Sequence, residues 1–242
     1  MTSPAPLQPP SDDAHGSVRD ERAGALPVGE MTFAEYLVFD DGSSERRYEY
    51  VGGKVYGMST GTDDHAAIAT NVVGALLPGA RNARCRVYSN SMRVLTPRER
   101  SYIPDVMVYC GPRPSGVSLY REHPCLIIEV LSPSTRQIDL DEKLEHYREI
   151  ETLQAYWIIE ATWRCIYRHW RDADGAWQFE EVVGDGVLPV PCPTATSLTL
   201  HDVYEDVDVP SEPPPPNLHR VREVGAEYTI GDAATAAPAH AG

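Results

Sequence analysis

Two apolar runs that each contain one acid constrain the fold of this chain most strongly. They cover residues 103–108 (Ile-Pro-Asp-Val-Met-Val) and 126–131 (Leu-Ile-Ile-Glu-Val-Leu). Continuous apolar runs of this length are typical of strands buried on both faces of a sheet. A carboxylate in such a strand is costly unless it reaches water or a partner. Either acid alone, Asp105 or Glu129, is explained by a strand end or an arginine. Two of them on strands expected to be adjacent favour a functional pair.

The surrounding pattern predicts an α/β (α+β) domain around a mixed central sheet. Thr32 is placed to cap a short helix, Gly52-Gly53 to turn a hairpin, and Asp139 with Glu142 to cap a later helix. Pro78-Gly79 is expected to end the helix before it. The expected helices are 33–39, 63–77 and 139–149, the hairpin strands are 48–51 and 54–56, and the other strands are 84–95, 104–110, 125–131, 155–160, 164–170, 177–183 and 198–204.

Two flanking segments differ in composition from this domain. Residues 1–30 are rich in Pro, Ala and acids, and residues 205–242 are acidic, then Pro-rich, then Ala-rich. Neither has hydrophobic periodicity, so we predict disordered tails around one domain at 31–204. The net charge of −15 comes partly from these tails, since 31–204 contains 17 basic and 24 acidic residues, or −7.

The negative charge and the apolar content exclude some classes of function. A protein with a net negative charge repels the phosphate backbone, which excludes simple electrostatic coating of nucleic acid. A small metal site can still approach a phosphate. No run reaches the roughly 20 apolar residues of a membrane span, and residues 1–30 lack the apolar segment of a secretory signal. The five scattered cysteines form no C-x-x-C pair. We expect reduced thiols in a cytoplasmic protein, and no zinc site.

Lysine is rare in this chain. Of 21 basic residues only Lys54 and Lys143 are lysine. Lys143 follows Asp139 by four residues and precedes Tyr147 by four, so all three share one flank of the predicted helix. Lys143 is either a solvated helix residue or an ammonium directed at the acids of the neighbouring strands. The scarcity of lysine favours the second alternative.

Paired carboxylates on adjacent strands suit a hard divalent cation. Mg²⁺ takes oxygen ligands and often only one or two protein carboxylates, which leaves positions for water and phosphate oxygens. Asp105 and Glu129 are therefore predicted to bind Mg²⁺, with Mn²⁺ as a possible substitute. A local basic cluster is either a solvated face or a set of phosphate contacts, and consists of Arg81, Arg84 and Arg86.

Several short motifs, in their order and spacing, resemble the Uma-type restriction endonuclease family of the PD-(D/E)XK nuclease superfamily. The resemblance covers about 31–204 and implies the superfamily's restriction-endonuclease-like αβββαβ core, here with an N-terminal hairpin and extra C-terminal strands. The motifs are Arg47-Tyr48-Glu49-Tyr50-Val51-x-Gly53-Lys54-Val55, His65, Pro104-Asp105-Val106, Ile128-Glu129-Val130-Leu131-Ser132-Pro133-Ser134-Thr135, Asp139-x-x-x-Lys143-x-x-x-Tyr147 and Tyr156-Trp157-Ile158-Ile159.

The resemblance assigns roles to individual residues. It implies that Asp105 and Glu129 are the two acids of the motif and that the carbonyl of Val130 is a further metal ligand. The superfamily's lysine two residues after the second acid is replaced by Leu131, and Lys143 takes its part. Glu49 is either a member of the site or a surface residue paired with Arg46 or Arg47. His65 is either a phosphate contact or proton carrier, or an ordinary residue near a helix N-terminus.

We therefore expect a metal-dependent endonuclease acting on DNA, with a homodimer as the candidate assembly, no organic cofactor and no membrane association. One alternative is a non-catalytic interaction module on the same fold, which the acidic balance supports. Another is a metal-dependent hydrolase of a smaller phosphate ester.

Overall fold

A computed structural model of the chain describes residues 26–41, 46–58, 61–112, 115–116, 118–193 and 196–214. Its helices are α1 (Phe33–Phe39), α2 (Asp63–Asn82), the π-helical turn η1 (Ile138–Glu142), α3 (Lys143–Arg148) and α4 (Leu200–Val203). Its strands are β1 (Leu26–Glu30), β2 (Tyr48–Val51), β3 (Lys54–Gly57), β4 (Arg86–Ser89), β5 (Arg93–Thr96), β6 (Arg100–Tyr102), β7 (Val106–Tyr109), β8 (Tyr120–Arg121), β9 (Leu126–Val130), β10 (Ala155–Ile159), β11 (Cys165–Arg171), β12 (Trp177–Val183), β13 (Val187–Val190) and β14 (Thr196–Thr199).

The central sheet has the strand order β12-β11-β10-β9-β7-β4. Strands β9 and β10 are parallel and joined by η1 and α3, while the other neighbours are antiparallel. The predicted mixed sheet is confirmed. The elements α2, β4, β7, β9, α3 and β10 follow in the expected order of helix, three strands, helix and strand.

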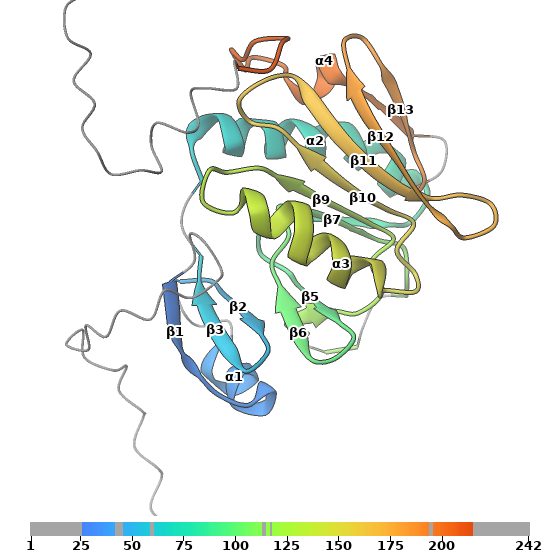
Figure 1. Ribbon diagram of the computed structural model, residues 1–242. Coiled ribbons are helices and arrows are strands. Elements are labelled where there is room, and N and C mark those ends of the chain that lie inside the picture. The colour runs from blue at the N-terminus through green and yellow to red at the C-terminus, as the bar shows by residue number, and fades with distance from the viewer. Residues whose placement is uncertain are drawn as a thin grey trace, which may run out of the picture.

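The two long helical segments cover opposite faces of this sheet (Figure 1). On one face α2 buries Ile68, Val72 and Leu76 against alternate residues of β7, β9 and β10. On the other face Tyr147 of α3 packs with Met107, Ile127 and their neighbours. Strands covered on both sides require side chains that are apolar throughout, which explains the uninterrupted runs in the sequence.

A second sheet, with the order β1-β3-β2-β6-β5-β8, contains the predicted hairpin. Gly52 and Gly53 turn it with φ of +58° and +89°, values that glycine adopts at little cost. Helix α1 has its capping box at Thr32 and packs Tyr36 against Tyr50 of β2. Strand β6 pairs with β2 through Ser101 and Tyr50, and this pairing brings the hairpin next to the start of β7.

The predicted end of the second helix at Pro78-Gly79 is wrong. Helix α2 continues to Asn82 with Pro78 inside it. Proline removes one helical hydrogen bond, but Ala80 beyond it is buried in the core beneath the sheet. Tertiary packing of this last turn outweighs the local cost.

The predicted strand 84–95 is two strands in different sheets. Its first half is β4 of the central sheet and its second half is β5 of the N-terminal sheet. The chain turns at Asn90, whose φ is +44°, a left-handed conformation that asparagine tolerates. The backbone N–H of Asn90 donates to the carbonyl of Asp105 (3.0 Å), which fixes the turn against the start of β7.

Asp139 is not the predicted helix cap. The helical segment starts upstream, and Asp139 lies within η1 with a side chain that is 2% exposed. Its Oδ2 accepts a hydrogen bond from Thr135 instead of from the helix backbone. The buried side chain is thus directed toward the sheet.

The boundaries of the folded domain also differ from prediction. Residues 26–30, predicted to be disordered, form β1 because their backbone pairs with β3. Beyond Tyr204, Val207 is 3% exposed and the carbonyl of Pro210 accepts from the N–H of Arg164 (2.8 Å). Within the predicted last strand, residues 200–203 form α4, capped by Thr199 and Asp202. The rest of both predicted tails, 1–25 and 215–242, lies outside the described residues.

The expectation of reduced thiols is wrong as well. Disulfides join Cys85 to Cys110 and Cys125 to Cys192, and Cys165 is a free, buried cysteine. Sequence separations of 25 and 67 residues hide these pairs, because only the sheet brings their segments together.

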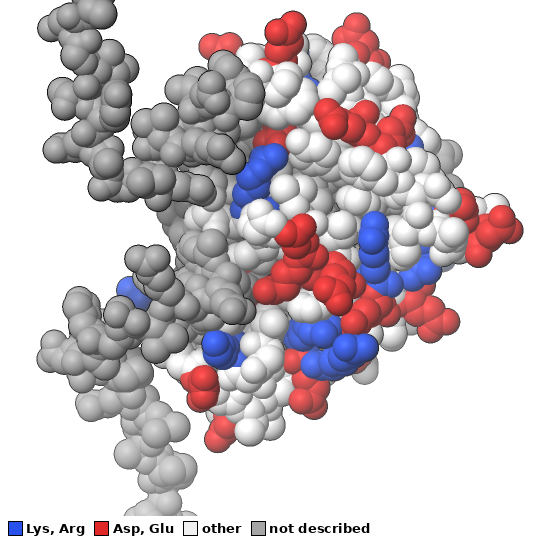
Figure 2. Space-filling view, in the orientation of Figure 1, with Lys and Arg blue, Asp and Glu red and all other residues white. Residues whose placement is uncertain are grey.

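No helix among the described residues is long and apolar enough to cross a membrane. The face seen in Figure 2 carries acidic side chains near its centre with basic ones beside them. Its described part shows no continuous basic stripe.

Candidate active site

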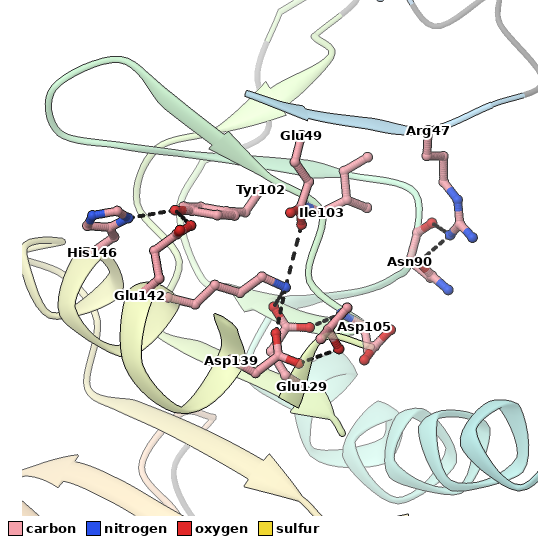
Figure 3. A network of polar contacts seen from close by, with 12 residues as sticks. Arg47, Glu49, Asn90, Tyr102, Ile103, Asp105, Glu129, Asp139, Glu142 and His146 are labelled. Atoms are coloured by element: carbon pink, nitrogen blue, oxygen red, sulfur yellow. Dashed lines mark hydrogen bonds and ion pairs between the residues drawn. The ribbon is translucent and has the colours of Figure 1, made fainter. Parts of the chain in front are cut away.

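Four acids and one lysine converge at the ends of the central strands. Glu49 comes from β2, Asp105 precedes β7, and Glu129 lies near the end of β9. Asp139 and Lys143 come from the helical segment that follows β9. Figure 3 shows the acidic side chains pointing into a common space. All five residues are between 2% and 7% exposed, so water screens their charges little.

Strand register explains why Asp105 and Glu129 meet. The antiparallel pairing of β7 and β9 sets Val106 opposite Ile128, so the next pair along is Asp105 and Glu129. Both acids lie on the face covered by α3, as Met107 and Ile127 do two residues away. The backbone N–H of Asp105 donates to Glu129 Oε2 (3.2 Å), and that of Val130 donates to Asp105 Oδ2 (2.8 Å). The predicted pairing of the two acids is therefore present.

Lys143 is buried and not solvated. Its ammonium Nζ lies 2.9 Å from Glu129 Oε1, 2.9 Å from Asp139 Oδ1 and 3.5 Å from Glu49 Oε1. The hydroxyl of Tyr147, one helical turn further, donates to Glu129 Oε1 (3.0 Å). The i, i+4 flank predicted from the sequence thus faces the two strands.

Burial and crowding shift the ionisation of these groups. Burial raises the pKa of Glu129 well above its usual value, against the opposing charge of Lys143. The pKa of Asp139 is raised for the same reason. Burial alone would lower the pKa of Lys143, but Asp139 and Glu129 outweigh it and hold that pKa well above normal. Lys143 is therefore a permanent cation among more carboxylates than it can neutralise.

Glu49 and His65, for which the sequence left two interpretations each, both lie at this site. Glu49 is 6% exposed, and its Oε1 accepts from the N–H of Ile103 (3.4 Å) as well as facing Lys143. His65, in the first turn of α2, places Nε2 3.2 Å from Asp105 Oδ2. Burial would lower the pKa of His65, but the hydrogen bond to Asp105 and its charge give a net increase. The positions of Glu49 and His65 therefore place both side chains beside the acids and the lysine of this site.

Some residues of the site were not predicted to have a role there. Asp139 was expected only as a helix cap. Its i, i+4 spacing to Lys143 is the sequence feature that could have placed it in the site. Arg47 lines the same cavity, which measures ≈ 70 Å³ and has room for an ion with several waters but not for a nucleotide. Its Nη1 donates to the carbonyl of Asn90 (2.6 Å) and contacts the side-chain oxygen of Asn90. No sequence pattern identifies that pair, because it depends on the turn between β4 and β5.

Leu131 occupies the position where the superfamily pattern places lysine. It is 3% exposed and packs in the core with Tyr147. The ammonium at Glu129 comes from Lys143 instead, as the resemblance implied.

The predicted basic cluster lies away from these acids. Arg81 is in the last turn of α2, Arg84 follows that helix, and Arg86 begins β4. His65 marks the other end of α2, and sixteen residues of helix at about 1.5 Å each span about 24 Å. The structure does not bring the arginines to the carboxylate cavity.

The residues of the site fit a hard divalent cation. The donors available are carboxylate oxygens and the carbonyl of Val130, the ligands that Mg²⁺ prefers. Glu49, Asp105, Glu129 and Asp139 carry more negative charge than Lys143 and His65 can balance. A divalent cation would offset the charges of the neighbouring carboxylates, which add to the effect of burial on the pKa of Glu129.

The chain is similar to several known proteins. The Uma2 family model, described as "Putative restriction endonuclease", matches residues 33–201. An uncharacterised Synechocystis protein, slr1290, is 28% identical over 154 residues, which cover 63% of this chain and 80% of that protein. A second, sll1609, is 27% identical over 158 residues, 64% of this chain and 89% of that protein.

One similar solved structure is described as "a putative nuclease belonging to DUF820" from Anabaena variabilis. It has a TM-score of 0.61 and 20% sequence identity, and the match covers 74% of this chain and 99% of that one. At this identity the match shows a shared fold.

Proposed function

The chain belongs to the Uma2 family described as putative restriction endonucleases, and on that premise we propose that it is a metal-dependent endonuclease that hydrolyses phosphodiester bonds of DNA. One observation carries the proposal: Asp105 and Glu129 face each other across β7 and β9, with Lys143 bonded to Glu129. A structural ion pair needs one carboxylate for one ammonium. This site buries three carboxylates around Lys143 and a fourth, Asp105, beside His65. Burying so many acids is costly in a chain that does not use them to bind a cation.

Asp105, Glu129 and the carbonyl of Val130 would hold Mg²⁺, with Mn²⁺ as a substitute. The bound ion supplies Lewis acidity at the phosphate and lowers the pKa of a water molecule. The two backbone hydrogen bonds between the β7 and β9 ends keep both carboxylates in place before any ligand arrives. Such preorganisation is what an electrostatic site requires.

Lys143 would offset the charge that develops on the phosphate. Its ammonium lies within ion-pair distance of Glu129, Asp139 and Glu49, and the contact to Glu49 is the longest at 3.5 Å. A phosphate oxygen would exchange most readily with Glu49, which leaves Glu129 and Asp139 to orient the ammonium. His65 beside Asp105 would carry a proton at the same end of the site, since its hydrogen bond to Asp105 outweighs burial and raises its pKa.

Arginines would supply the contacts to the DNA backbone. Arg47 lines the cavity, and Arg81, Arg84 and Arg86 would contact phosphates about 24 Å away, along the length of α2. Cleavage of both strands needs two active sites, which a homodimer of this chain would provide.

Incubation of the purified protein with supercoiled plasmid tests the proposal. Relaxed and linear DNA should form with Mg²⁺ or Mn²⁺ and not with a chelator. Asp105→Asn and Glu129→Gln should abolish cleavage while the circular dichroism spectrum is unchanged. Glu145→Gln is the matched control, because Glu145 is an exposed acid on the same helix as Lys143.

The result also separates the alternatives. Hydrolysis of bis(p-nitrophenyl) phosphate without DNA cleavage would assign the site to smaller phosphate esters. Folded protein that binds Mg²⁺ but cleaves neither substrate would indicate a non-catalytic module, which the net charge of −15 favours.

A further inference from the structure

Four of the five cysteines meet in one cluster outside the carboxylate site. They come from four separate places in the fold. Cys85 lies between α2 and β4, Cys110 follows β7, Cys125 precedes β9, and Cys192 follows β13. The two disulfides that they form are in contact, because the Sγ atoms of Cys110 and Cys125 are 3.5 Å apart. The Sγ atoms of Cys110, Cys125 and Cys192 all lie within 4.8 Å of one another, and Cys85 is bonded to Cys110.

We propose that the reduced chain binds one Zn²⁺ ion through the thiolates of Cys85, Cys110, Cys125 and Cys192. A tetrahedral site with zinc–sulfur bonds of about 2.3 Å places its sulfur atoms about 3.8 Å apart. The spacing between Cys110 and Cys125, which belong to different disulfides, is already close to this value. Two disulfides that serve only to cross-link the fold would not need to lie in contact with each other.

The chemistry of the cluster selects a soft metal ion. Four thiolates and no carboxylate suit zinc, whereas Mg²⁺ requires oxygen ligands. Cys192 is 8% exposed, and Cys85 and Cys125 pack against the core beneath the sheet. Arg84 and Arg86 flank Cys85 in the sequence, and adjacent cations favour thiolates and the −2 charge of a zinc tetrathiolate. With four protein ligands the site is closed, as structural zinc sites are.

The position of the cluster separates it from the proposed nuclease centre. Asp105 and Cys110 lie beyond opposite ends of β7, and Cys125 and Glu129 stand near opposite ends of β9. Four residues along β9 and five along β7, at about 3.3 Å each, place the two sites about 13–16 Å apart. The zinc ion would join the two central strands to the end of α2 and to the C-terminal hairpin. It would therefore act on stability and not on the phosphate.

Zinc binding requires the thiol form. Each disulfide takes two electrons and two protons from a dithiol reductant, which is oxidised to its own disulfide. The four thiols then release four protons as they coordinate one Zn²⁺ ion. Oxidation by a disulfide oxidant reverses both steps and releases the metal.

The test uses the full chain, reduced with a dithiol under anaerobic conditions, dialysed against Zn²⁺ and freed of excess metal. We expect about one zinc ion per chain by mass spectrometry and about four protons released per ion. Co²⁺ in place of zinc should give the visible bands of tetrahedral thiolate coordination. Zinc should raise the melting temperature of the reduced chain, and a chelator should reverse that increase.

Single substitutions provide the controls. Cys110→Ser and Cys192→Ser should lose the stoichiometric zinc and the Co²⁺ bands. Cys165→Ser should keep both, because the Sγ of the buried Cys165 is in neither disulfide. Should a serine variant fail to fold, protection of four thiols from alkylation by zinc in the unmodified chain gives the same answer. Reduced protein that holds no stoichiometric zinc, or disulfides that resist reduction in the folded chain, would overturn the proposal.

Discussion

Lys143 is surrounded by more negative charge than it can neutralise. Glu129, Asp139 and Glu49 all lie within 3.5 Å of its ammonium, and Asp105 is bonded to the backbone beside Glu129. Removing the ammonium leaves buried acids without a partner, whereas removing one acid relieves repulsion among the rest. The two kinds of substitution therefore have opposite effects on stability.

Glu129→Gln should abolish cleavage and leave the metal-free protein at least as stable as before. Glutamine retains an oxygen that accepts from Lys143 and Tyr147, and it removes a charge whose burial is unfavourable. Denaturant unfolding in the presence of a chelator measures the difference. Mg²⁺ should stabilise the unmodified protein and not the variant. A large loss of stability would instead make Glu129 a structural partner of Lys143.

Lys143→Arg should lower the single-turnover rate of DNA cleavage by about 10²–10³-fold, nearly as much as Lys143→Ala. The guanidinium is a larger planar group, and the side chain it would replace is 3% exposed between η1 and the strands. Calorimetry should find Mg²⁺ affinity little changed, since Lys143 is not a proposed ligand. Cleavage at the unmodified rate in the arginine variant would remove Lys143 from the reaction.

Two glycines of helix α2 differ in how much space they leave for a side chain. A Cβ on Gly74 would meet no atom within 4 Å, while a Cβ on Gly79 would lie 1.9 Å from Thr196 Oγ1 and 3.1 Å from Thr196 Cβ. The second glycine is where β14 approaches the helix. Gly74 has no such neighbour, so its only effect is the backbone entropy that a glycine loses when the helix forms.

Gly74→Ala should raise the free energy of unfolding by about 0.5–1 kcal/mol, because alanine is the better helix former. Gly79→Ala should lower it by about 1–3 kcal/mol, because the new methyl group displaces Thr196. Thermal and urea unfolding of the two variants, which make the same change in one helix, measure the effect of packing alone. Equal effects of the two substitutions would mean that β14 does not pack on α2 as described.

We expect the junction of α3 with the far strands of the central sheet to be sensitive to acid. His169 of β11 packs between Tyr156 of β10 and Phe179 of β12, with Arg148 of α3 bonded to its Nδ1 (3.2 Å). Burial and then the charge of Arg148 lower the pKa of His169 to about 4. The unfolded chain, with a pKa near 6.5, therefore takes up the proton first as the pH falls.

This shift should make the folded protein less stable as the pH falls from about 6.5 to about 4, by at most about 1.4 kcal/mol per unit and about 3 kcal/mol in all. Above that window both states are neutral, and below it both are protonated. His169→Gln should lose stability less steeply over the same window, which urea unfolding at several pH values measures. Parallel curves for the two proteins would mean that His169 is protonated equally in both states.

For the molecule as a whole, local patterns predicted most elements and the carboxylate pair. The capping box at Thr32, the Gly52-Gly53 turn and the apolar runs depend on neighbouring residues, so they were predictable. The i, i+4 spacing put Asp139, Lys143 and Tyr147 on one helix flank. The scarcity of lysine favoured a flank that faces the acids, and Lys143 does bond to Glu129. These features need no knowledge of distant contacts.

What the sequence did not predict depends on contacts between distant segments. The turn at Asn90 sends β4 and β5 into different sheets and creates the contact with Arg47. The cysteine cluster joins residues up to 67 positions apart within a disulfide, and no spacing rule covers it. Helix α2 passes Pro78 because Ala80 is buried, which is again a tertiary effect.

The folded domain begins and ends at positions that depend on contacts across the whole chain. A chain cut to 26–214 should unfold at the same denaturant midpoint as the full sequence, whereas one cut to 31–204 should be less stable by about 3 kcal/mol. The shorter chain loses the pairing of β1 with β3, the buried side chain of Val207, and the bond from Asn71 Nδ2 to the carbonyl of Glu205 (2.8 Å). Limited proteolysis of the full chain should accordingly stop near residues 26 and 214. A fragment of 31–204 as stable as the full chain would show that β1 and the segment after α4 add nothing to the fold.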